Sequence, residues 1–524
     1  MPGPLAAPAE ALDGPRVRRL TRRSAAQRAV TTWSTRLGDA WSTAASVAIG
    51  LALLGGWLAS VRDEIAARAP VSGTPLPASV TATVSLVVTV AALTGLLDRL
   101  GPISASPAAA AWWIPLPADR RGLLRGDLVR VVLLCALVSA ALTAPLALVR
   151  ADRPSLATTG TASVTAAALA ASLAGAVALL QTRGRNGGLS TVAGAVAVTA
   201  SATAALLATA PPLARAAGRL TALDLPAVPL PALAPVVAAA LGLLFVADRG
   251  LGRIGSGALR SLGSASSYAS ASVFSMDTRD LGRALARAPR RTPGRPRRFR
   301  RVRGPGQAVA TADLILLARS PWQLGQLVIA TALPVLAIRT AGLDRLPAVG
   351  AAGLLLGWLG AAVAVGHPAR QGQGMPALDR LLPLSPGQLI AARSVAPALA
   401  LAVVCGCSGL LVGQGSGNTP AWTALALGTV PAWTAAALRG AYRPELDWSG
   451  PVVSTPMGVL PAGLGATLVQ GVDVGLLGSL PIIAAVLLGG APSVVLVTVQ
   501  WAWAGALAAA ALTAVARRGP GSSG

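Results

Sequence analysis

The chain has 524 residues, of which 53% are hydrophobic, 3% aromatic and 12% charged, and its mean hydropathy is +0.63. This composition is too apolar for a soluble globular protein. The formal net charge of +25 arises from arginine alone, because the chain contains no lysine. The arginines cluster between apolar runs and lack the aromatic platform of nucleic-acid-binding proteins, so we expect no nucleic-acid partner.

Residue types that many enzymes depend on are scarce. Without lysine, the chain can form neither a Walker A phosphate-binding loop nor a Schiff base. His367 is the only histidine, and Cys135, Cys405 and Cys407 lie in apolar runs, where a thiol behaves as a small hydrophobic group. We therefore expect no enzyme activity, no ATP hydrolysis, no metal and no cofactor in this chain.

Residues 1–40 form a basic segment at the start of the chain. A Pro- and Ala-rich stretch is followed by Arg16, Arg18, Arg19, Arg22, Arg23, Arg28 and Arg36. The basic stretch is too long for a signal peptide, and the apolar run after it has full spanning length. We predict a cytoplasmic tail with an amphipathic elbow that lies on the lipid surface.

Apolar runs of about twenty residues, the length that crosses a bilayer, recur along the chain. They predict an all-α polytopic membrane protein with about twelve transmembrane helices as two fused six-helix repeats, at residues 41–247 and 321–516. Gly353 and Gly357 have the spacing that permits close helix contact. The predicted spans are residues 41–61, 78–97, 128–149, 161–181, 188–209, 229–247, 322–338, 346–366, 394–413, 421–438, 474–490 and 494–515.

The stretch from Val453 to Gly490 is too long for one span, since as a helix it would measure about 57 Å. Asp473 at the membrane centre would cost about 3 kcal/mol. We therefore predict that Asp473 lies at the cytoplasmic edge, with residues 456–470 in the interface and a span beginning at Val474. A functional Asp473 within the membrane is the alternative.

Arginine-rich connections alternate with nearly uncharged ones, and this predicts the orientation. Both termini, including the tail 517–524, should face the cytoplasm, with the chain in a bacterial cytoplasmic membrane. The polar segment 248–320 starts Ser/Gly-rich and ends Arg-rich. We predict a cytoplasmic linker held to anionic membrane lipid, and docking of a partner protein is the alternative.

Two connections, after the second and the eighth predicted span, resemble each other. Residues 111–125 read AWWIPLPADRRGLLR, and residues 378–393 read LDRLLPLSPGQLIAAR. Each has a Pro-Leu-Pro or Pro-Leu-Ser turn, then an apolar pair, then an arginine before the next span. The second proline of each turn, or its serine, suits a helix N-terminus, and the apolar pair should face the membrane or a partner groove.

A loop of this kind between the second and third helices of a six-helix unit resembles that of the permease subunits of ABC-2 type exporters. Trp112, Trp113 and the Pro-Ala-Asp-Arg-Arg run are also similar to uncharacterised actinobacterial ABC permease-like membrane proteins. The resemblance implies a separate ABC ATPase subunit, in two copies, that uses the ATP and rocks the two bundles to export a substrate, which the sequence does not identify. It implies contact with that ATPase for Leu116, Arg120, Arg121, Leu123, Leu124, Leu384, Gln388, Leu389 and Ile390.

Three alternatives remain open. The two loops can be ordinary interfacial anchors, with tryptophan at headgroup level and arginine on phosphate. The run Gly95-Leu96-Leu97-Asp98-Arg99-Leu100-Gly101 approaches the Gly-x-Leu-Ala-Asp-Arg-x-Gly-Arg type motif of the major facilitator superfamily, although it is one residue short and Pro102 follows it. This favours a twelve-helix secondary transporter. A membrane-bound enzyme is the third alternative. It would need convergent carboxylates, but the carboxylate pairs of this chain, Glu445 with Asp447 and Asp63 with Glu64, lie isolated in loops.

Overall fold

The computed structural model describes residues 13–28, 33–67, 76–150, 156–185, 188–221, 230–274, 302–443, 452–455, 458–461 and 470–518. Within these residues the chain is helical, apart from one short β-hairpin and the turns between elements. The hairpin pairs β1 (Val452–Thr455) with β2 (Gly458–Pro461) in antiparallel register, Val452 opposite Pro461. The prediction of a helical multi-pass membrane protein is confirmed.

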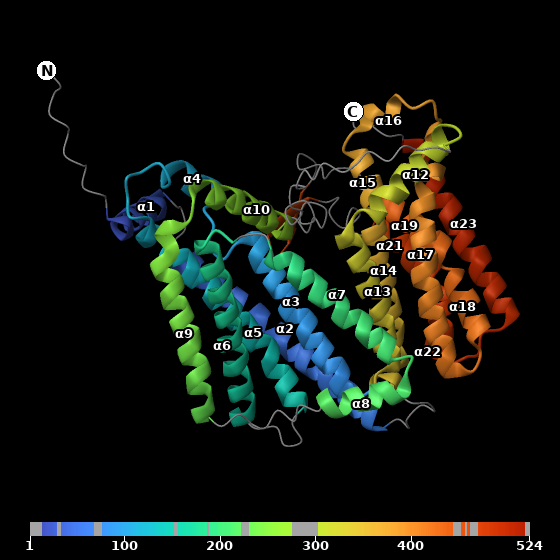
Figure 1. Ribbon diagram of the computed structural model, residues 1–524, viewed down its shortest axis with the longest axis horizontal. Helices are drawn as coiled ribbons and strands as arrows, with labels where there is room; N and C mark the ends of the chain where they lie inside the picture. Colours follow the sequence, from blue (N-terminus) through green and yellow to red (C-terminus); the bar gives the residue numbers. More distant parts are fainter. Residues whose placement is uncertain are drawn as a thin grey trace. The chain divides into compact units, whose positions relative to one another are not determined.

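The helices group into two compact units (Figure 1). Unit 1 comprises Met1–Ala67, Val90–Ala193 and Asp224–Pro289, and unit 2 comprises Arg68–Thr89, Gly194–Leu223 and Arg290–Gly524. The units therefore differ from the predicted halves 41–247 and 321–516, because the start of one early helix and most of another group with the C-terminal residues.

Unit 1 is built around α5, α6 and α9, which run side by side in Figure 1. Its buried core includes Leu97, Leu124, Ala174 and Leu251. Its elements are α1 (Gly14–Arg28), α2 (Trp33–Ala67), the end of α3 (Ala78–Leu100), α4 (Pro107–Trp112), α5 (Arg120–Arg150), α6 (Leu156–Thr182), the start of α7 (Leu189–Leu207), α9 (Leu230–Gly250), the 3₁₀ turn η1 (Leu251–Arg253) and α10 (Ser256–Phe274).

Unit 2 surrounds a core at Trp358 and Trp433, which are both fully buried. Besides the start of α3, most of α7 and the β-hairpin, it contains α8 (Pro211–Thr221), α12 (Pro305–Ala318), α13 (Pro321–Arg339), η2 (Leu343–Arg345), α14 (Pro347–Val365), α15 (His367–Gln373), α16 (Pro376–Arg380), α17 (Pro386–Ser416), α18 (Thr419–Leu427), α19 (Val430–Ala441), α21 (Val472–Gly478), α22 (Leu480–Leu488) and α23 (Val494–Arg518).

Eleven helical segments in the described residues are long and apolar enough to cross a membrane, one fewer than the twelve predicted spans. The difference is the predicted span 474–490. It forms two short helices, α21 and α22, which are separated at Ser479 and have seven and nine residues. Pro481 provides the reason, because a proline lacks the N–H that would continue the helix.

The close helix contact predicted at Gly353 and Gly357 is confirmed between α14 and α13. A Cβ added at Gly353 would lie 2.4 Å from the Cβ of Ala337, and one added at Gly357 would lie 2.6 Å from the carbonyl oxygen of Ala330. The missing side chains therefore let the two backbones approach each other.

The segment 248–320, predicted as a polar linker, is ordered at both ends. It begins with the end of α9, η1 and α10, and it finishes with α12. Helix α10 packs closely, since a Cβ added at Gly263 would overlap the backbone of Ala105. The flanks of the predicted linker are therefore helical, whereas the arginine run at 290–301 lies outside the described residues.

Candidate functional site

The first predicted coupling loop joins α4 to α5, and Asp119 fixes its end. The carboxylate of Asp119 accepts hydrogen bonds from the backbone N–H groups of Arg121 (3.1 Å) and Gly122 (2.9 Å). These are two of the N–H groups that the first helical turn leaves without a partner. Helix α5 therefore begins at Arg120, and the prediction that Pro117 marks its start was wrong.

The second predicted coupling loop joins α16 to α17, and here the expected serine cap is confirmed. Ser385 Oγ accepts a hydrogen bond from the backbone N–H of Gln388 (3.3 Å), and Gln388 Oε1 accepts one from the backbone N–H of Ser385 (3.0 Å). Pro386 occupies the first helical position. The side chain of Gln388 thus closes a capping box.

The apolar pair of each loop faces the interior of its own unit. Leu123 and Leu124 are 3% and 5% exposed, and Leu389 and Ile390 are 3% and 4% exposed. Leu124 belongs to the core of unit 1, and Leu389 packs with Val309 of α12. These four side chains, which the resemblance predicts to contact an ATPase, are therefore covered by the protein itself.

The exposed apolar side chains of the loops lie on the short helices α4 and α16 and on the turns that follow them. In the first loop these are Trp112 and Leu116, and in the second they are Leu378 and Leu381. Leu384 is half-buried against the cluster that contains Leu389. Of the predicted apolar contact residues, Leu116 alone has an exposed side chain.

The arginines of the first loop are held by an acid from another helix. Arg121 donates from Nη2 to Asp248 Oδ2 at 2.5 Å, and Arg125 Nε lies 3.6 Å from Asp248 Oδ1. Asp248 is buried near the end of α9. This ion pair ties the start of α5 to α9, while Arg120 is half-buried beside it.

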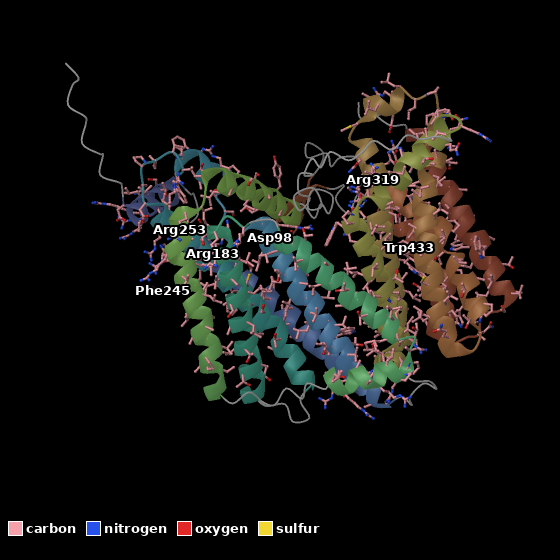
Figure 2. The ribbon with its side chains drawn as sticks, in the orientation of Figure 1. Asp98, Arg183, Phe245, Arg253, Arg319 and Trp433 are labelled. Carbon is pink, nitrogen blue, oxygen red and sulfur yellow. The ribbon has the colours of Figure 1, made fainter. Side chains whose placement is uncertain are left out.

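Asp98, the acidic residue of the carrier-like run, caps a helix. Its Oδ2 accepts a hydrogen bond from the backbone N–H of Ser190 (2.8 Å) in the first turn of α7, and its side chain is buried. Figure 2 labels Asp98 near the end of α3. A carboxylate at a helix N-terminus is a common structural arrangement.

A polar cluster that the sequence analysis missed occupies the core of unit 2, where α21 and α22 separate. Pro481 has no N–H for the carbonyl of Leu477, and Trp503 Nε1 donates to that carbonyl instead (2.7 Å). Gln500 is fully buried and lies between two further backbone groups at the break, the carbonyl of Gly478 and the N–H of Ile482. Its Nε2 donates to Gly478 O (2.6 Å), and its Oε1 accepts from the N–H of Ile482 (3.2 Å).

A second break, between α18 and α19, contacts the same helix. Gly428 lies at this break, and a Cβ added there would lie 2.8 Å from Gln500 Cγ and 3.1 Å from Trp501 Cδ1. Trp501 Nε1 donates to Ala424 O (3.1 Å). Helix α23 therefore supplies donors to two interrupted helices, the arrangement that lets irregular backbone exist within a membrane protein.

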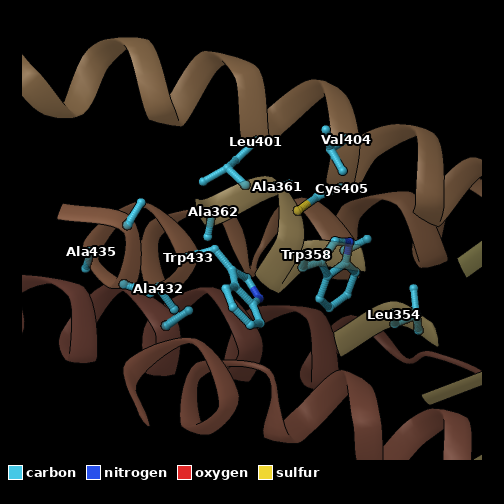
Figure 3. Packing of buried hydrophobic residues seen from close by; sticks show 14 of the residues in the cluster. Leu354, Trp358, Ala361, Ala362, Leu401, Val404, Cys405, Ala432, Trp433 and Ala435 are labelled. Atoms are coloured by element: carbon cyan, nitrogen blue, oxygen red, sulfur yellow. The ribbon is translucent and has the colours of Figure 1, made fainter. Parts of the chain in front are cut away.

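Trp433 links the two breaks to the aromatic core shown in Figure 3. Its Nε1 donates to Ser479 Oγ (2.9 Å), and Ser479 donates in turn to Gly475 O (2.8 Å). Its ring meets Trp358 edge to face, with centroids 6.5 Å apart. Trp358 Nε1 and Thr434 Oγ1 are buried without a hydrogen-bond partner.

Several buried charged side chains lie close to the second loop. Arg393 of α17 donates from Nη2 to Asp379 Oδ1 at 2.6 Å, and both side chains are 6% exposed. Gly372 leaves room for this guanidinium, since a Cβ there would overlap it. Asp313 of α12 lies nearby, buried, and its Oδ2 has no hydrogen-bond partner. Burial raises the pKa of Asp313 to about 6; Arg393 opposes this increase in pKa and Asp379 adds to it.

Asp473 occupies a helix start with its charge paired. Its Oδ1 accepts from the N–H groups of Gly471 (2.8 Å) and Val474 (2.9 Å), and its Oδ2 lies 3.1 Å from Arg439 Nη2. Both side chains of this ion pair are partly exposed. Of residues 456–470, predicted to lie in the interface, residues 458–461 form strand β2 and Gln470 a turn, and the rest lies outside the described part.

The described residues contain no group of three His, Cys, Asp or Glu side chains that could hold a metal ion. Cys135, Cys405 and Cys407 are free thiols.

Sequence patterns gave partial signals for these features. Pro431 and Pro481 within apolar runs mark the two breaks, but Gln500 stands 19 residues beyond Pro481 and shares no local pattern with it. Asp313 and Asp379 lie 66 residues apart, in separate elements. Only the tertiary structure brings such groups together.

Comparison with known proteins gave one match. Residues 74–451 match the model of a protein family described as a family of unknown function, DUF6297. No curated protein and no solved structure matches the chain.

Proposed function

Since the chain belongs to the DUF6297 family, whose model covers well over half of its length, we propose its function from its own residues. We propose that it is the membrane-spanning permease subunit of an ATP-driven exporter, powered by a separate ABC ATPase. It would lie in a bacterial cytoplasmic membrane with both termini in the cytoplasm. Its substrate is not identified by these observations.

The observation that carries this proposal is the shared construction of the two loops. In each, a short helix and a turn with an exposed leucine lead into the capped start of a 31-residue helix, α5 or α17. The apolar pair that follows the cap is buried. A partner that presses on Leu116 or Leu381 would therefore move the whole helix, because the buried pair fixes the turn to the core.

The interrupted helices of unit 2 also support a transport function. Discontinuous helices in a membrane occur where backbone is buried in protein or lines a path for substrate. Trp358 Nε1 and Thr434 Oγ1, which are buried in the same unit, have no hydrogen-bond partner. Small rotations of α22 against α23 could open this polar region without exposing charge.

The experiment that tests the proposal is affinity purification of the tagged chain from its native membrane. We expect a protein with Walker motifs to co-purify and to hydrolyse ATP, whereas the separated permease should not. The double substitution Leu116→Asp and Leu381→Asp should abolish co-purification, because both positions are exposed and the fold does not need them.

The matched control is Leu220→Asp, which changes an exposed leucine on α8, on the side predicted to face away from the cytoplasm. It should leave co-purification unchanged. Absence of any Walker-motif protein with the wild-type chain, or retention of the ATPase by the double variant, would contradict the proposal.

A secondary transporter is the second candidate, and the buried acids favour it. Proton-coupled carriers need an acid that binds and releases a proton, and burial raises the pKa of Asp313, which lies beside Asp379 and Arg393, to about 6. The two candidates differ in their energy source. Once the sensitivity of a deletion strain identifies an exported compound, a protonophore added to ATP-supplied inverted vesicles should spare transport by an exporter and stop transport by a proton-coupled carrier.

A further inference from the structure

A groove of about 580 Å³ runs along one face of α5 in unit 1. Its volume falls within the range of ligand pockets. One end is polar and the other apolar. It is lined by Arg18 of α1, by Trp113, and by Gly126, Asp127, Val129, Arg130, Leu133, Leu134 and Leu137 of α5.

Helix α1 forms the polar end because two glycines of α5 admit it. A Cβ added at Gly122 would lie 2.2 Å from Pro15 Cδ, and one added at Gly126 would lie 2.6 Å from Arg18 Cζ. Gly122 and Gly126 are one small-xxx-small step apart on α5. Arg18 is thereby 8% exposed, although it is a charged residue of a basic helix.

The charge of Arg18 is held in place and neutralised. It donates to the carbonyl oxygen of Leu123 and forms an ion pair with Asp127 at 2.6 Å between Nη2 and Oδ1. Its guanidinium also lies over the ring of Trp113, 5.6 Å from the centroid. Arg18 thus builds the wall of the groove and leaves little net charge there.

Arg130 supplies the positive charge that remains. It lies one helical turn beyond Asp127, its side chain is exposed, and it forms no ion pair with any described residue. It stands near the start of the span 128–149 predicted from the sequence, where we expect the lipid headgroups. Arg16, Arg19 and Arg23 of α1 add further exposed positive charge at the same end.

The apolar end continues from Arg130 into the span. Leu133, Leu134 and Leu137 follow at helical spacing, each about half-exposed, over about 10 Å of helix. An anionic group at the arginine and a hydrocarbon chain along the leucines would satisfy both ends. A soluble phosphate would use the first end only.

We propose that this groove binds one anionic phospholipid of the surrounding bilayer, with the headgroup phosphate on Arg130 beside Trp113 and an acyl chain along Leu133, Leu134 and Leu137. The site joins α1 to α5, the helix that carries the first loop. The proposal stands independently of the exporter function, because it depends on the groove alone.

The test is native mass spectrometry of the full-length, delipidated protein titrated with dioleoyl phosphatidylglycerol or dioleoyl phosphatidylcholine. These lipids share their chains and differ in headgroup charge. We expect one phosphatidylglycerol to bind more tightly than phosphatidylcholine. Arg130→Gln should weaken phosphatidylglycerol binding about fivefold, which corresponds to about 1 kcal/mol per arginine near a membrane surface.

The matched control is Arg183→Gln, which removes an exposed arginine at the end of α6 (Figure 2) and should leave the lipid affinity unchanged. Equal affinity of the wild-type protein for the two lipids, or equal effects of the two substitutions, would overturn the proposal. Glycerophosphoglycerol, the headgroup without acyl chains, should not compete, and displacement of the lipid by it would assign the site to a soluble phosphate.

A second variant keeps the proposal testable if Arg130→Gln fails to fold. Leu134→Trp narrows the apolar end without changing charge and should reduce the number of bound phosphatidylglycerol molecules by one. Unchanged lipid occupancy in this variant would count against the groove as the binding site.

Discussion

Gln500 replaces, with one side chain, a backbone hydrogen bond between Gly478 and Ile482 that the break at Pro481 opens. We expect Gln500→Leu to lower the free energy of unfolding by about 2 kcal/mol, because a buried carbonyl and a buried N–H lose their partners. Thermal unfolding of the purified protein in detergent measures the change. Gln414→Leu, the same substitution at an exposed position of α17, is the control and should have little effect. Equal melting temperatures for the two variants would disprove the role of Gln500.

Asp313 makes the free energy of unfolding depend on pH. Burial raises its pKa to about 6 from the ordinary 3.8, so between these values the folded state binds more protons than the unfolded state. Stability contributed at this site therefore falls as pH rises toward 6, and above pH 6 the ionised carboxylate remains a constant cost.

Asp313→Asn removes that cost, and we expect it to stabilise the protein at pH 8 by about 1 to 2 kcal/mol and by about half as much at pH 5. Melting temperatures at both pH values provide the measurement. Asp63→Asn, at an exposed acid of α2, should show no such difference. A gain of the same size at both pH values would mean that the effect does not come from titration.

At the scale of elements, the docking of α1 on α5 depends on close backbone approach. Gly122→Ala should displace α1, because its Cβ would lie 2.2 Å from Cδ and 3.0 Å from the backbone nitrogen of Pro15. We expect the amide hydrogens of α1 to exchange faster with deuterium in this variant. Gly56→Ala on α2, where a Cβ meets open space, is the matched control. Unchanged protection of α1 in Gly122→Ala would show that the packing tolerates the methyl group.

The two loop elements show what local sequence can and cannot predict. The serine of the second loop has its glutamine partner three residues later, so its cap was readable from the sequence. The side to which Leu123 and Leu389 turn was not readable, because an apolar pair at a membrane surface suits a lipid, a partner or the core. Burial beneath α1 in one loop and α12 in the other decides it.

For the whole molecule, the number of crossings determines the side of the C-terminus. Eleven crossings would place the termini on opposite sides of the membrane, whereas a crossing by α21 and α22 together would give twelve and place them on the same side. Helices α21 and α22 and the Ser479 between them cover Val472–Leu488, which is just long enough to span the membrane. We expect twelve crossings, because Arg439 and Asp473 form an ion pair at one end of this broken helix.

Cysteine labelling tests this arrangement. In a variant without Cys135, Cys405 and Cys407, a cysteine at Ala118, Ser385 or Arg517 should react with an impermeant maleimide in inverted vesicles. A cysteine at Leu220 should react only in right-side-out vesicles. Labelling of position 517 from the side opposite to position 118 would support eleven crossings and contradict the predicted orientation.

The sequence by itself determined the solvent of this protein and the approximate places of its helices, because a bilayer requires about twenty apolar residues for every crossing and arginine marks the ends. It also indicated the close contact at Gly353 and Gly357. Only the tertiary structure decided which helices can be interrupted without leaving buried backbone groups unpaired. The partners of these groups, Gln500 and Trp503, come from another helix. The tertiary structure also decided that α3 and α7 are each divided between the two units, and it brought Asp313, Asp379 and Arg393 together. Hydrophobicity is a property of each residue, whereas a buried polar group is stable only beside a partner that folding brings from elsewhere in the chain.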